Sequence, residues 1–247
     1  MEAAGRLARE GVTVTLVEKG QDLGGHLRNW YHLFPDRRSS DEVLEYLNGQ
    51  VSHQNIRLLK GCQVTGFHRD GNEFRVTTGN GETINADALL LATGFDLFRS
   101  ERKEEYGYGI YDNVITSADL ETMFRKNEIK LANGLIPERI GFVHCVGSRD
   151  EKVGNIYCSK LCCVTAVKQA IEVRKIIPSC KAVCFYMDIR MGGALYEELY
   201  KEAQEKYSVS FIRGKVSEVA VNISNRLVAK VDDTHVGSPL NMEMDML

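Results

Sequence analysis

With 247 residues the chain is long enough to bury a sizeable core and to form one large or two small domains. Its 31 Lys and Arg residues are nearly balanced by 34 Asp and Glu residues, so the net charge of −3 gives no global signal for nucleic-acid binding, and no run of about 18 apolar residues predicts a membrane span. Seven cysteines without a recognisable secretory signal favour a reducing, cytoplasmic location, where clustered thiols bind metals more often than they form disulfides.

The first predicted elements form half of a dinucleotide-binding unit. An alanine-rich helix over residues 1–10 ends at Gly11, and a strand over Val12–Val17 follows with Glu18 at its carboxyl end. In a βαβ unit of this kind, an acid at that place hydrogen-bonds the adenosine ribose. The strand and glycine-rich loop that should precede the helix are missing, so we expect an incomplete first domain. A solvated surface acid is the alternative reading of Glu18.

The rest of this first domain is predicted to be mixed. Gly24 and Gly25 allow the backbone to approach a bulky ligand closely. Three elements then follow: a helix over 41–51, an extended piece over 55–65, and a hairpin of 73–78 with 82–85 around Thr-Gly-Asn-Gly. Residues 86–95, A-D-A-L-L-L-A-T-G-F, predict a fully apolar buried strand that ends in Ala-Thr-Gly.

A second α/β unit begins near Glu138, after a charged segment, a Gly-rich loop and a short helix. Strands are predicted over 139–146, 182–187 and 209–213, and helices over 159–177 and 194–207. This alternation is typical of a doubly wound, mostly parallel sheet. Its first turn lacks the G-x-G-x-x-G loop that a pyrophosphate needs at a helix N-terminus.

Cysteines occupy that first turn instead. Cys145, Cys158, Cys162 and Cys163 follow the pattern C-x12-C-x3-C-C, with the first at a strand end and the others near a helix start. If residues 158–163 are helical, Cys158 and Cys162 share one face and Cys163 lies beside it. Four converging thiolates are what an iron–sulfur cluster requires. A redox disulfide with a spare thiol, a zinc site and inert core cysteines remain open on spacing alone.

The motifs E-x5-G-G, starting at Glu18, and Ala-Thr-Gly resemble the FAD-binding flavoprotein disulfide reductase superfamily. That resemblance implies FAD as cofactor. The residues that it implies as FAD contacts are Glu18, Lys19, Gly24, Gly25, His26, Val64, Ala92, Thr93 and Gly94.

A closer resemblance covers nearly the whole chain. The segments H-C-V-G-S-R-D-E, Y-C-S-K-L-C-C, F-Y-M-D-I-R and F-I-R-G-K-V-S-E resemble the A subunit of heterodisulfide reductase and its relatives. The resemblance implies a thioredoxin-reductase-like pair of doubly wound dinucleotide-binding folds and a 4Fe-4S cluster on the four cysteines named above. The stretch after Phe34-Pro35 lacks cysteine and resembles the A subunit of the quinone-interacting membrane-bound oxidoreductase complex.

We therefore expect an FAD-binding domain over 1–115, a connection over 116–137, a second Rossmann-like domain over 138–220 and a return to the FAD domain over 221–247, with both ends cut through the FAD domain. Lys168, about 7.5 Å along the helix from Cys163, is a candidate flavin-ring partner or a surface lysine. Cys180 and Cys184 are expected in the core.

The resemblance implies an oxidoreductase subunit that passes electrons between FAD and the cluster. Its implied partners are other subunits of a membrane-associated redox complex, an indirect link to quinone, and a soluble sulfur-metabolism reductase. Three alternatives stay open: a thiol-based FAD disulfide reductase, a heterodisulfide reductase subunit that takes part in flavin bifurcation, and a non-catalytic structural subunit.

Overall fold

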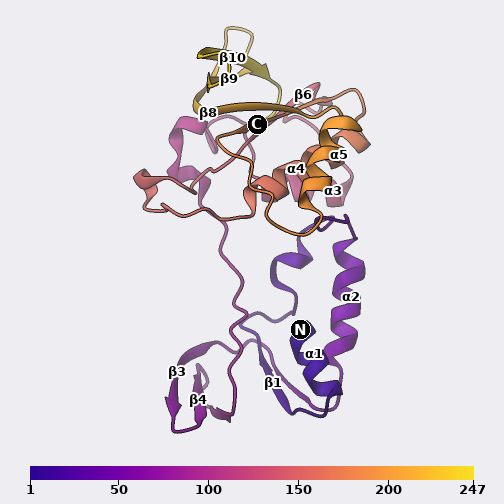
Figure 1. Cartoon of the computed structure of the whole chain (residues 1–247), viewed down its shortest axis with the longest axis vertical. Helices are drawn as coiled ribbons and strands as arrows, with labels where there is room; N and C mark the ends of the chain where they lie inside the picture. Colours follow the sequence, from indigo (N-terminus) through magenta and orange to yellow (C-terminus); the bar gives the residue numbers. More distant parts are fainter. The chain divides into compact units, whose positions relative to one another are not determined.

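A computed structural model describes all residues, 1–247, and the chain divides into two compact units (Figure 1). Unit 1 consists of residues 1–29 and 39–96, and unit 2 consists of residues 30–38 and 97–247. The short segment 30–38 therefore belongs to unit 2, although the sequence on both sides of it belongs to unit 1. None of the helices combines the length and the apolar character that a bilayer crossing requires.

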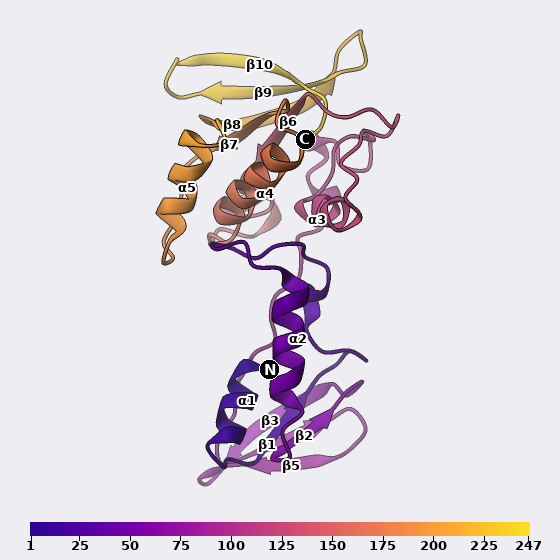
Figure 2. The same cartoon turned by 90° about the vertical axis from the view of Figure 1, so that its right-hand side faces the viewer.

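Unit 1 contains a two-stranded parallel sheet and two helices that pack against each other. Its elements are α1 (Glu2–Arg9), β1 (Val14–Val17), η1 (Gly25–Arg28), α2 (Ser40–Val51) and β2 (Ile56–Leu59). The strands pair in register, with Val14 opposite Ile56. Figure 2 shows α1 and α2 side by side, and Gly5 permits this contact because a Cβ there would lie 2.6 Å from the Cβ of Gln50.

A separate antiparallel sheet completes unit 1. It is formed by β3 (Val64–Asp70), β4 (Glu73–Thr78) and β5 (Thr83–Ala86). The hairpin predicted around Thr-Gly-Asn-Gly is present, and Gly81 takes the left-handed conformation (φ 86°) that its turn requires. The hydroxyl of Thr78 donates to the side-chain oxygen of Asn80 (2.6 Å), which ties the turn to the strand.

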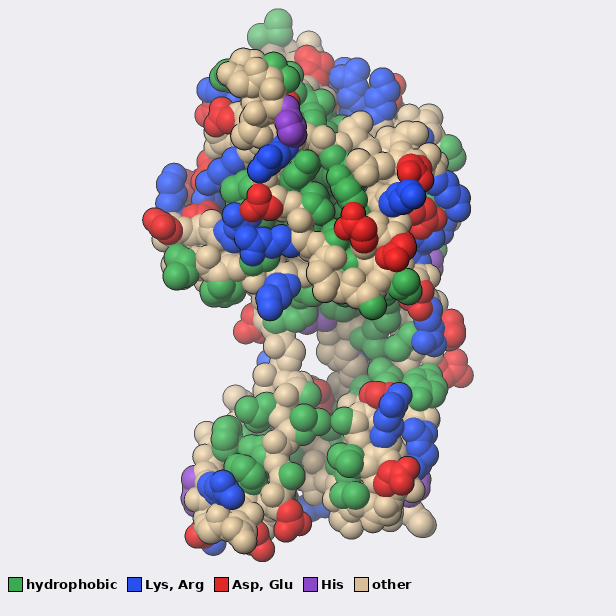
Figure 3. Space-filling model, in the orientation of Figure 1, with side chains coloured by type: hydrophobic (Ala, Val, Ile, Leu, Met, Phe, Trp, Pro, Cys, Tyr) green, Lys and Arg blue, Asp and Glu red, His purple; other side chains and the backbone are tan.

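The apolar strand predicted over 86–95 does not form beyond Ala86. Residues 87–99 have no regular structure, and Leu90 and Leu91 are 68% and 64% exposed. A buried strand needs neighbours that supply ladder hydrogen bonds, and β1 and β2 pair only with each other. Without such a neighbour the segment stays unpaired, and Figure 3 shows hydrophobic side chains exposed on the surface of unit 1.

Unit 2 is built on a five-stranded sheet in the order β10-β9-β8-β7-β6. Its longer elements are α3 (Ser117–Lys126), β6 (Arg139–Val143), α4 (Cys162–Ile176), β7 (Lys181–Tyr186), α5 (Tyr196–Glu205), β8 (Ser210–Val221), β9 (Leu227–Asp233) and β10 (Ser238–Met244). Three short 3-10 turns also occur: η2 (Ser100–Arg102), η3 (Glu104–Tyr106) and η4 (Glu151–Val153). β6, β7 and β8 are parallel, as the α/β alternation predicted, while β8, β9 and β10 are antiparallel.

The C-terminal segment completes this sheet instead of returning to the first domain, as had been expected for 221–247. After the antiparallel strands β9 and β10, the chain runs beside the free edge of β6, where Met246 forms a parallel bridge with Ile140. The N–H of Gly141 donates to the carbonyl of Met246 (2.9 Å). The free edge of β6 has backbone N–H and C=O groups without strand partners, and residues 245–247 form hydrogen bonds with some of these groups.

The main core of unit 2 lies between α4 and the parallel strands. Val164, Val167 and Ile171 of α4 are fully buried there. Cys180 and Cys184 are also fully buried, which confirms their predicted core positions, and burial raises the pKa of both thiols. These two cysteines therefore behave as small apolar residues.

Candidate functional site

The cysteine loop joins the carboxyl end of β6 to the N-terminus of α4. β6 ends at Val143, and Cys145 lies in a turn with φ 60° rather than at the last position of the strand. Parallel strands present their carboxyl ends at one edge of a sheet, which is where doubly wound folds bind ligands. The loop therefore occupies the usual ligand-binding edge of unit 2.

The helix start differs from the prediction. α4 begins at Cys162, with Leu161 as N-cap, so Cys162 and Cys163 are its first two residues and Cys158 precedes it. Lys160 has φ 62°, a left-handed conformation that interrupts a helix at a non-glycine residue. Cys158 therefore does not share a helix face with Cys162, and the turn at Lys160 directs it separately.

Hydrogen bonds within the loop hold its shape. The hydroxyl of Ser148 donates to the carbonyl of Tyr157 (3.0 Å) and accepts the N–H of Ser159 (2.9 Å). The side-chain amide of Asn155 donates to the carbonyl of Gly147 (2.9 Å). Because these bonds link its first and last thirds, the loop holds the cysteines at both ends in fixed positions.

The thiols themselves are free and close together. All seven cysteines of the chain are unpaired, and the sulfurs of Cys145 and Cys162 lie 3.9 Å apart. The N–H of Lys160 donates to the sulfur of Cys158 (3.3 Å), and the N–H of Arg190 donates to that of Cys163 (3.5 Å). Both sulfurs therefore accept backbone hydrogen bonds, which are among the contacts that tune cluster-ligating sulfurs.

Electrostatics concentrate negative charge on one sulfur. Hydrogen bonds from the thiols of Cys145 and Cys163 lower the pKa of Cys162. The same bonds, together with burial, raise the pKa of Cys145 and of Cys163.

A buried histidine precedes Cys145. His144 is 6% exposed, and neither of its ring nitrogens has a hydrogen-bond partner. Burial lowers its pKa to about 4, an effect that the nearby Cys162 opposes. Sequence reasoning missed His144, and its position directly before a loop cysteine is the signal that could have found it.

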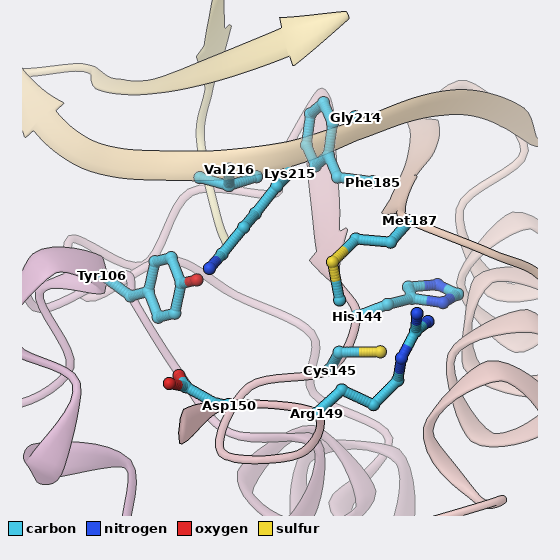
Figure 4. A pocket seen from close by; sticks show the side chains of 10 residues that line it. All are labelled: Tyr106, His144, Cys145, Arg149, Asp150, Phe185, Met187, Gly214, Lys215 and Val216. Carbon is cyan, nitrogen blue, oxygen red and sulfur yellow. The ribbon is translucent and has the colours of Figure 1, made fainter. Parts of the chain in front are cut away.

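A small cavity lies beside Cys145 (Figure 4). Its enclosed space is about 10 Å³, room for a single water. Asp150 on one wall pairs with the buried ammonium of Lys103 (2.6 Å), and Lys103 also pairs with Glu105 (2.6 Å). Sequence reasoning did not single out Lys103, because its stretch is strongly charged and was expected to be solvated. The Lys103–Asp150 pair ties residues 103–105 to the cysteine loop.

Lys168 is buried, which the surface-lysine reading did not anticipate. It is 2% exposed and forms an ion pair with Glu121 of α3, which is 3% exposed. Glu121 also accepts the side-chain amide of Gln169 (2.7 Å) and the N–H of Tyr31 (2.9 Å). Burial lowers the pKa of Lys168, and the Glu121 carboxylate opposes this effect. The Lys168 ammonium is therefore held within unit 2 by the Glu121 carboxylate, which accepts hydrogen bonds from three donors.

In unit 1, Glu18 and the glycine pair lie where a dinucleotide-binding fold needs them. Glu18 directly follows β1 and accepts the N–H of Gly20 (2.7 Å), leaving its second oxygen available. Gly24 (φ 108°) has no room for a side chain, since a Cβ would lie 2.6 Å from Leu44. Gly25 (φ 49°) faces open space, with no atom within 4 Å of where its Cβ would be.

The structure brings the Ala-Thr-Gly segment to this glycine turn. His26 contacts the carbonyl of Phe95 (2.8 Å), and the two rings lie 5.0 Å apart. Ala92, Thr93 and Gly94 are exposed, and Gly94 takes φ 70°. Val64 at the start of β3 is 39% exposed, and Lys19 is exposed. The predicted FAD residues of unit 1 are thus accessible, and those near His26 and Phe95 are joined by direct contact.

Comparison with known proteins identifies the family. A family model described as pyridine nucleotide-disulphide oxidoreductase matches residues 1–127, more than half of the chain. The chain belongs to this family. Curated relatives of the chain are named as A subunits of heterodisulfide reductases.

Those relatives are considerably longer than this chain. The A subunit of the H(2)/formate:CoB-CoM heterodisulfide,ferredoxin reductase of Methanococcus maripaludis is 42% identical over 171 residues, which are 66% of this chain and 26% of that relative. An iron-sulfur A subunit of the CoB--CoM heterodisulfide reductase of Methanopyrus kandleri is 37% identical over 191 residues, 73% of this chain and 27% of that relative. The chain spans about a quarter of these relatives.

Solved structures agree on the fold. The thioredoxin reductase of T. acidophilum superposes with a TM-score of 0.57 at 14% identity, covering 99% of this chain and 70% of that one. A bacillithiol disulfide reductase from Bacillus cereus gives a TM-score of 0.50 at 14% identity, covering 99% and 71%. The predicted thioredoxin-reductase-like α/β fold with an incomplete FAD half is confirmed.

The family's cofactor and the predicted cluster can be tested against these residues. Gly25 and Gly94 leave open backbone next to the contacting residues His26 and Phe95, which suits a flat, bulky dinucleotide. No three His, Cys, Asp or Glu side chains are arranged around a single metal ion. A 4Fe-4S cluster instead needs four thiolates, and the free cysteines of the loop, the N–H groups directed at them and the unpartnered His144 suit such a group.

Proposed function

We propose that this chain is a flavin and iron–sulfur electron-transfer subunit of a multi-subunit oxidoreductase. The observation that carries the proposal is the close approach of two free cysteines at the two ends of the loop between β6 and α4, where the sulfurs of Cys145 and Cys162 lie 3.9 Å apart. In a doubly wound fold this loop would otherwise cradle a dinucleotide's phosphates. Thiols in place of phosphate-binding glycines favour a cluster over a nicotinamide.

Unit 1 would hold FAD. The free oxygen of Glu18 is available to a ribose hydroxyl, and the backbone at Gly24 and Gly25 can approach the pyrophosphate because neither residue carries a side chain. The rest of the FAD site would be lined by Lys19, His26, Val64 and residues 92–94. When bound, FAD supplies an acceptor and donor of one or two electrons. This chain's residues bind it, orient it and limit its contact with water.

Unit 2 would hold a 4Fe-4S cluster on Cys145, Cys158, Cys162 and Cys163. The N–H groups of Lys160 and Arg190 donate to two of these sulfurs and would stabilise their negative charge. A cluster held there would supply one-electron transfer. Lys168 is buried and paired with Glu121 inside unit 2, so we do not assign it to the flavin ring.

The partners are inferred from the relatives' names and from the cysteine-free stretch after Phe34-Pro35. Relatives are named as A subunits, which supports assembly with other subunits. We infer a membrane-associated redox complex with an indirect link to quinone and a soluble sulfur-metabolism reductase as the other electron partner. Attachment to the inner membrane face would then come through those partners.

Anaerobic purification with visible spectroscopy and iron analysis tests this proposal. Flavin with about four irons per chain is expected. The variant Cys162→Ser should lose the iron and its broad absorption while keeping flavin, because Glu18 and the glycine turn lie in unit 1. Cys62→Ala, which removes a buried cysteine from unit 1, is the control and should keep its iron. Unchanged iron in Cys162→Ser would refute the ligand assignment.

A thiol-based FAD disulfide reductase is the second candidate. It is favoured by the short distance between Cys145 and Cys162 and by the lowered pKa of Cys162, which are features of a nucleophilic thiolate beside a resolving thiol. Flavin without iron, together with two rapidly titrating thiols that Cys162→Ser abolishes, would support this candidate. If the purified chain contains neither flavin nor iron, only a structural role remains.

A further inference from the structure

His144 is the buried polar side chain that the proposed function does not yet use. It follows β6 directly, is 6% exposed, and both of its ring nitrogens are buried without a hydrogen-bond partner. Buried polar atoms in folded proteins nearly always have a partner, so a pair of unpartnered nitrogens in one ring calls for an explanation. The ring therefore marks a place where another group is expected.

The surroundings of the ring indicate what that group is. Figure 4 shows the His144 ring on the opposite side of the cavity from Tyr106, and Arg149 also lines this cavity. The ring lines the same small cavity as Cys145, the first cysteine of the loop. Arg149 is committed to Asp188 (2.9 Å) and has no acceptor to offer the ring. The partner still to be found for the ring is therefore a negatively charged hydrogen-bond acceptor, and the sulfurs of the neighbouring cysteines are such acceptors.

We propose that the imidazole N–H of His144 donates a hydrogen bond to a sulfur of the cluster site and thereby raises the reduction potential of the cluster. This inference rests on the proposed function and deepens it. Reduction adds one negative charge to the cluster, and a donor directed at sulfur stabilises the reduced state more than the oxidised state. His144 is in this sense a positioning residue that acts through the cysteine sulfurs.

A bound water is the competing partner. The cavity beside Cys145 includes His144 in its wall and has room for one water, which could satisfy one nitrogen of the ring. In that case His144 would have a structural role and the potential would not depend on it. The two accounts differ in the redox behaviour of variants that keep the cluster.

The test compares His144→Leu, which cannot donate, with His144→Asn, which can. Anaerobically purified full chain is assayed for iron and flavin, and the midpoint potential of the cluster is measured by redox titration followed by electron paramagnetic resonance. We expect His144→Leu to lower the reduction equilibrium constant about tenfold, which is about 59 mV for a one-electron couple. His144→Asn should stay near the wild-type potential. Met187→Leu, a swap of similar volume in the same cavity wall, is the control.

Each outcome decides the matter. A negative shift in His144→Leu with rescue in His144→Asn supports the proposal, and loss of iron from His144→Leu overturns it. An unchanged potential in His144→Leu, an equal shift in Met187→Leu, or loss of iron from both histidine variants overturns it in favour of a structural role. Absence of iron from the wild-type chain refutes the proposed cluster itself, which is a separate failure.

Discussion

At the scale of single residues, the charges buried in unit 2 are few and fully paired. Lys168 and Glu121 form one such pair, and Lys103 with Asp150 and Glu105 forms another. A charge in a low-dielectric interior is costly unless a partner and hydrogen bonds compensate for its lost hydration. These pairs therefore fix the geometry around α3, α4 and the cysteine loop more than they add to net stability.

The Glu121 carboxylate should be the most sensitive of these groups. Glu121→Leu leaves the Lys168 ammonium, the Gln169 amide and the Tyr31 N–H without their acceptor, so we expect the free energy of unfolding to fall by about 3–5 kcal/mol. This free energy is measured by urea denaturation, with circular dichroism as the probe. The double variant Glu121→Leu/Lys168→Met should recover part of the loss because no buried charge remains.

An exposed acid serves as the control for this experiment. Glu128 has a side chain that is 61% exposed and pairs only with Lys130 at 3.6 Å. Glu128→Gln should change stability by no more than about 0.5 kcal/mol. If Glu121→Leu also falls within that range, the buried pair is not the constraint that its geometry suggests.

At the scale of elements, the ends of helices and strands decide where the functional groups lie. α3 begins with a capping box, in which the Thr116 hydroxyl accepts the N–H of Asp119 (3.1 Å) and the Asp119 carboxylate accepts the N–H of Thr116 (2.8 Å). This cap sets the start of the helix that carries Glu121. The N-terminus of α4 lacks a side-chain cap, and the cysteines lie there instead.

Removal of the cap should weaken α3 by a predictable amount. Thr116→Ala is expected to lower the free energy of unfolding by about 1 kcal/mol, because one orphan N–H of the first turn loses its acceptor. Thr122→Ala on the exposed side of the same helix should be nearly neutral. Equal effects of the two substitutions in chemical denaturation would count against the cap.

The C-terminal segment makes a pH-dependent contribution at Asp245. Burial alone would raise the pKa of this carboxyl, but the bonds from Arg226 (2.8 Å) and from the N–H groups of Glu138 and Arg139 outweigh burial and lower the pKa below its usual range. A carboxyl with a lowered folded-state pKa stabilises the protein above its unfolded pKa, and this contribution disappears as the pH falls through the folded value.

Asp245→Asn should therefore cost stability near neutral pH but not in acid. We expect a loss of about 1–3 kcal/mol at pH 7, since a charged acceptor of three donors is removed. The difference between wild type and variant should shrink below about pH 4. Urea midpoints measured from pH 7 to acid check this, and a difference that does not depend on pH would contradict the role of the carboxylate.

At the scale of the whole molecule, two compact units divide the proposed chemistry. The residues proposed for FAD lie in unit 1, and the cysteines lie in unit 2. Each ligand should stabilise the unit that binds it, because binding to the folded state alone shifts the folding equilibrium. The exposed apolar residues of 87–97 belong mostly to unit 1, which has the smaller set of buried side chains.

Hydrogen exchange should separate the two ligands. At about 100 times its Kd, FAD is expected to stabilise unit 1 by about 2.7 kcal/mol and to slow exchange in β1, β2 and the glycine turn. Anaerobic reconstitution with iron and sulfide should instead slow exchange in residues 144–165. Glu18→Ala should weaken only the first effect, and protection of unit 2 by FAD alone would argue against the division.

The sequence by itself determined the local features of this protein: the strand that ends before Glu18, the hairpin around Thr-Gly-Asn-Gly, the parallel α/β order of unit 2 and the cysteine spacing. These follow from periodicity and turn chemistry, which act over a few residues. Only the tertiary structure decided that 87–95 stays unpaired, that α4 starts at Cys162, that residues 245–247 join β6, and that His144 and Lys168 are buried. Strand pairing and burial depend on neighbours distant in sequence, and an apolar or polar pattern does not specify those neighbours.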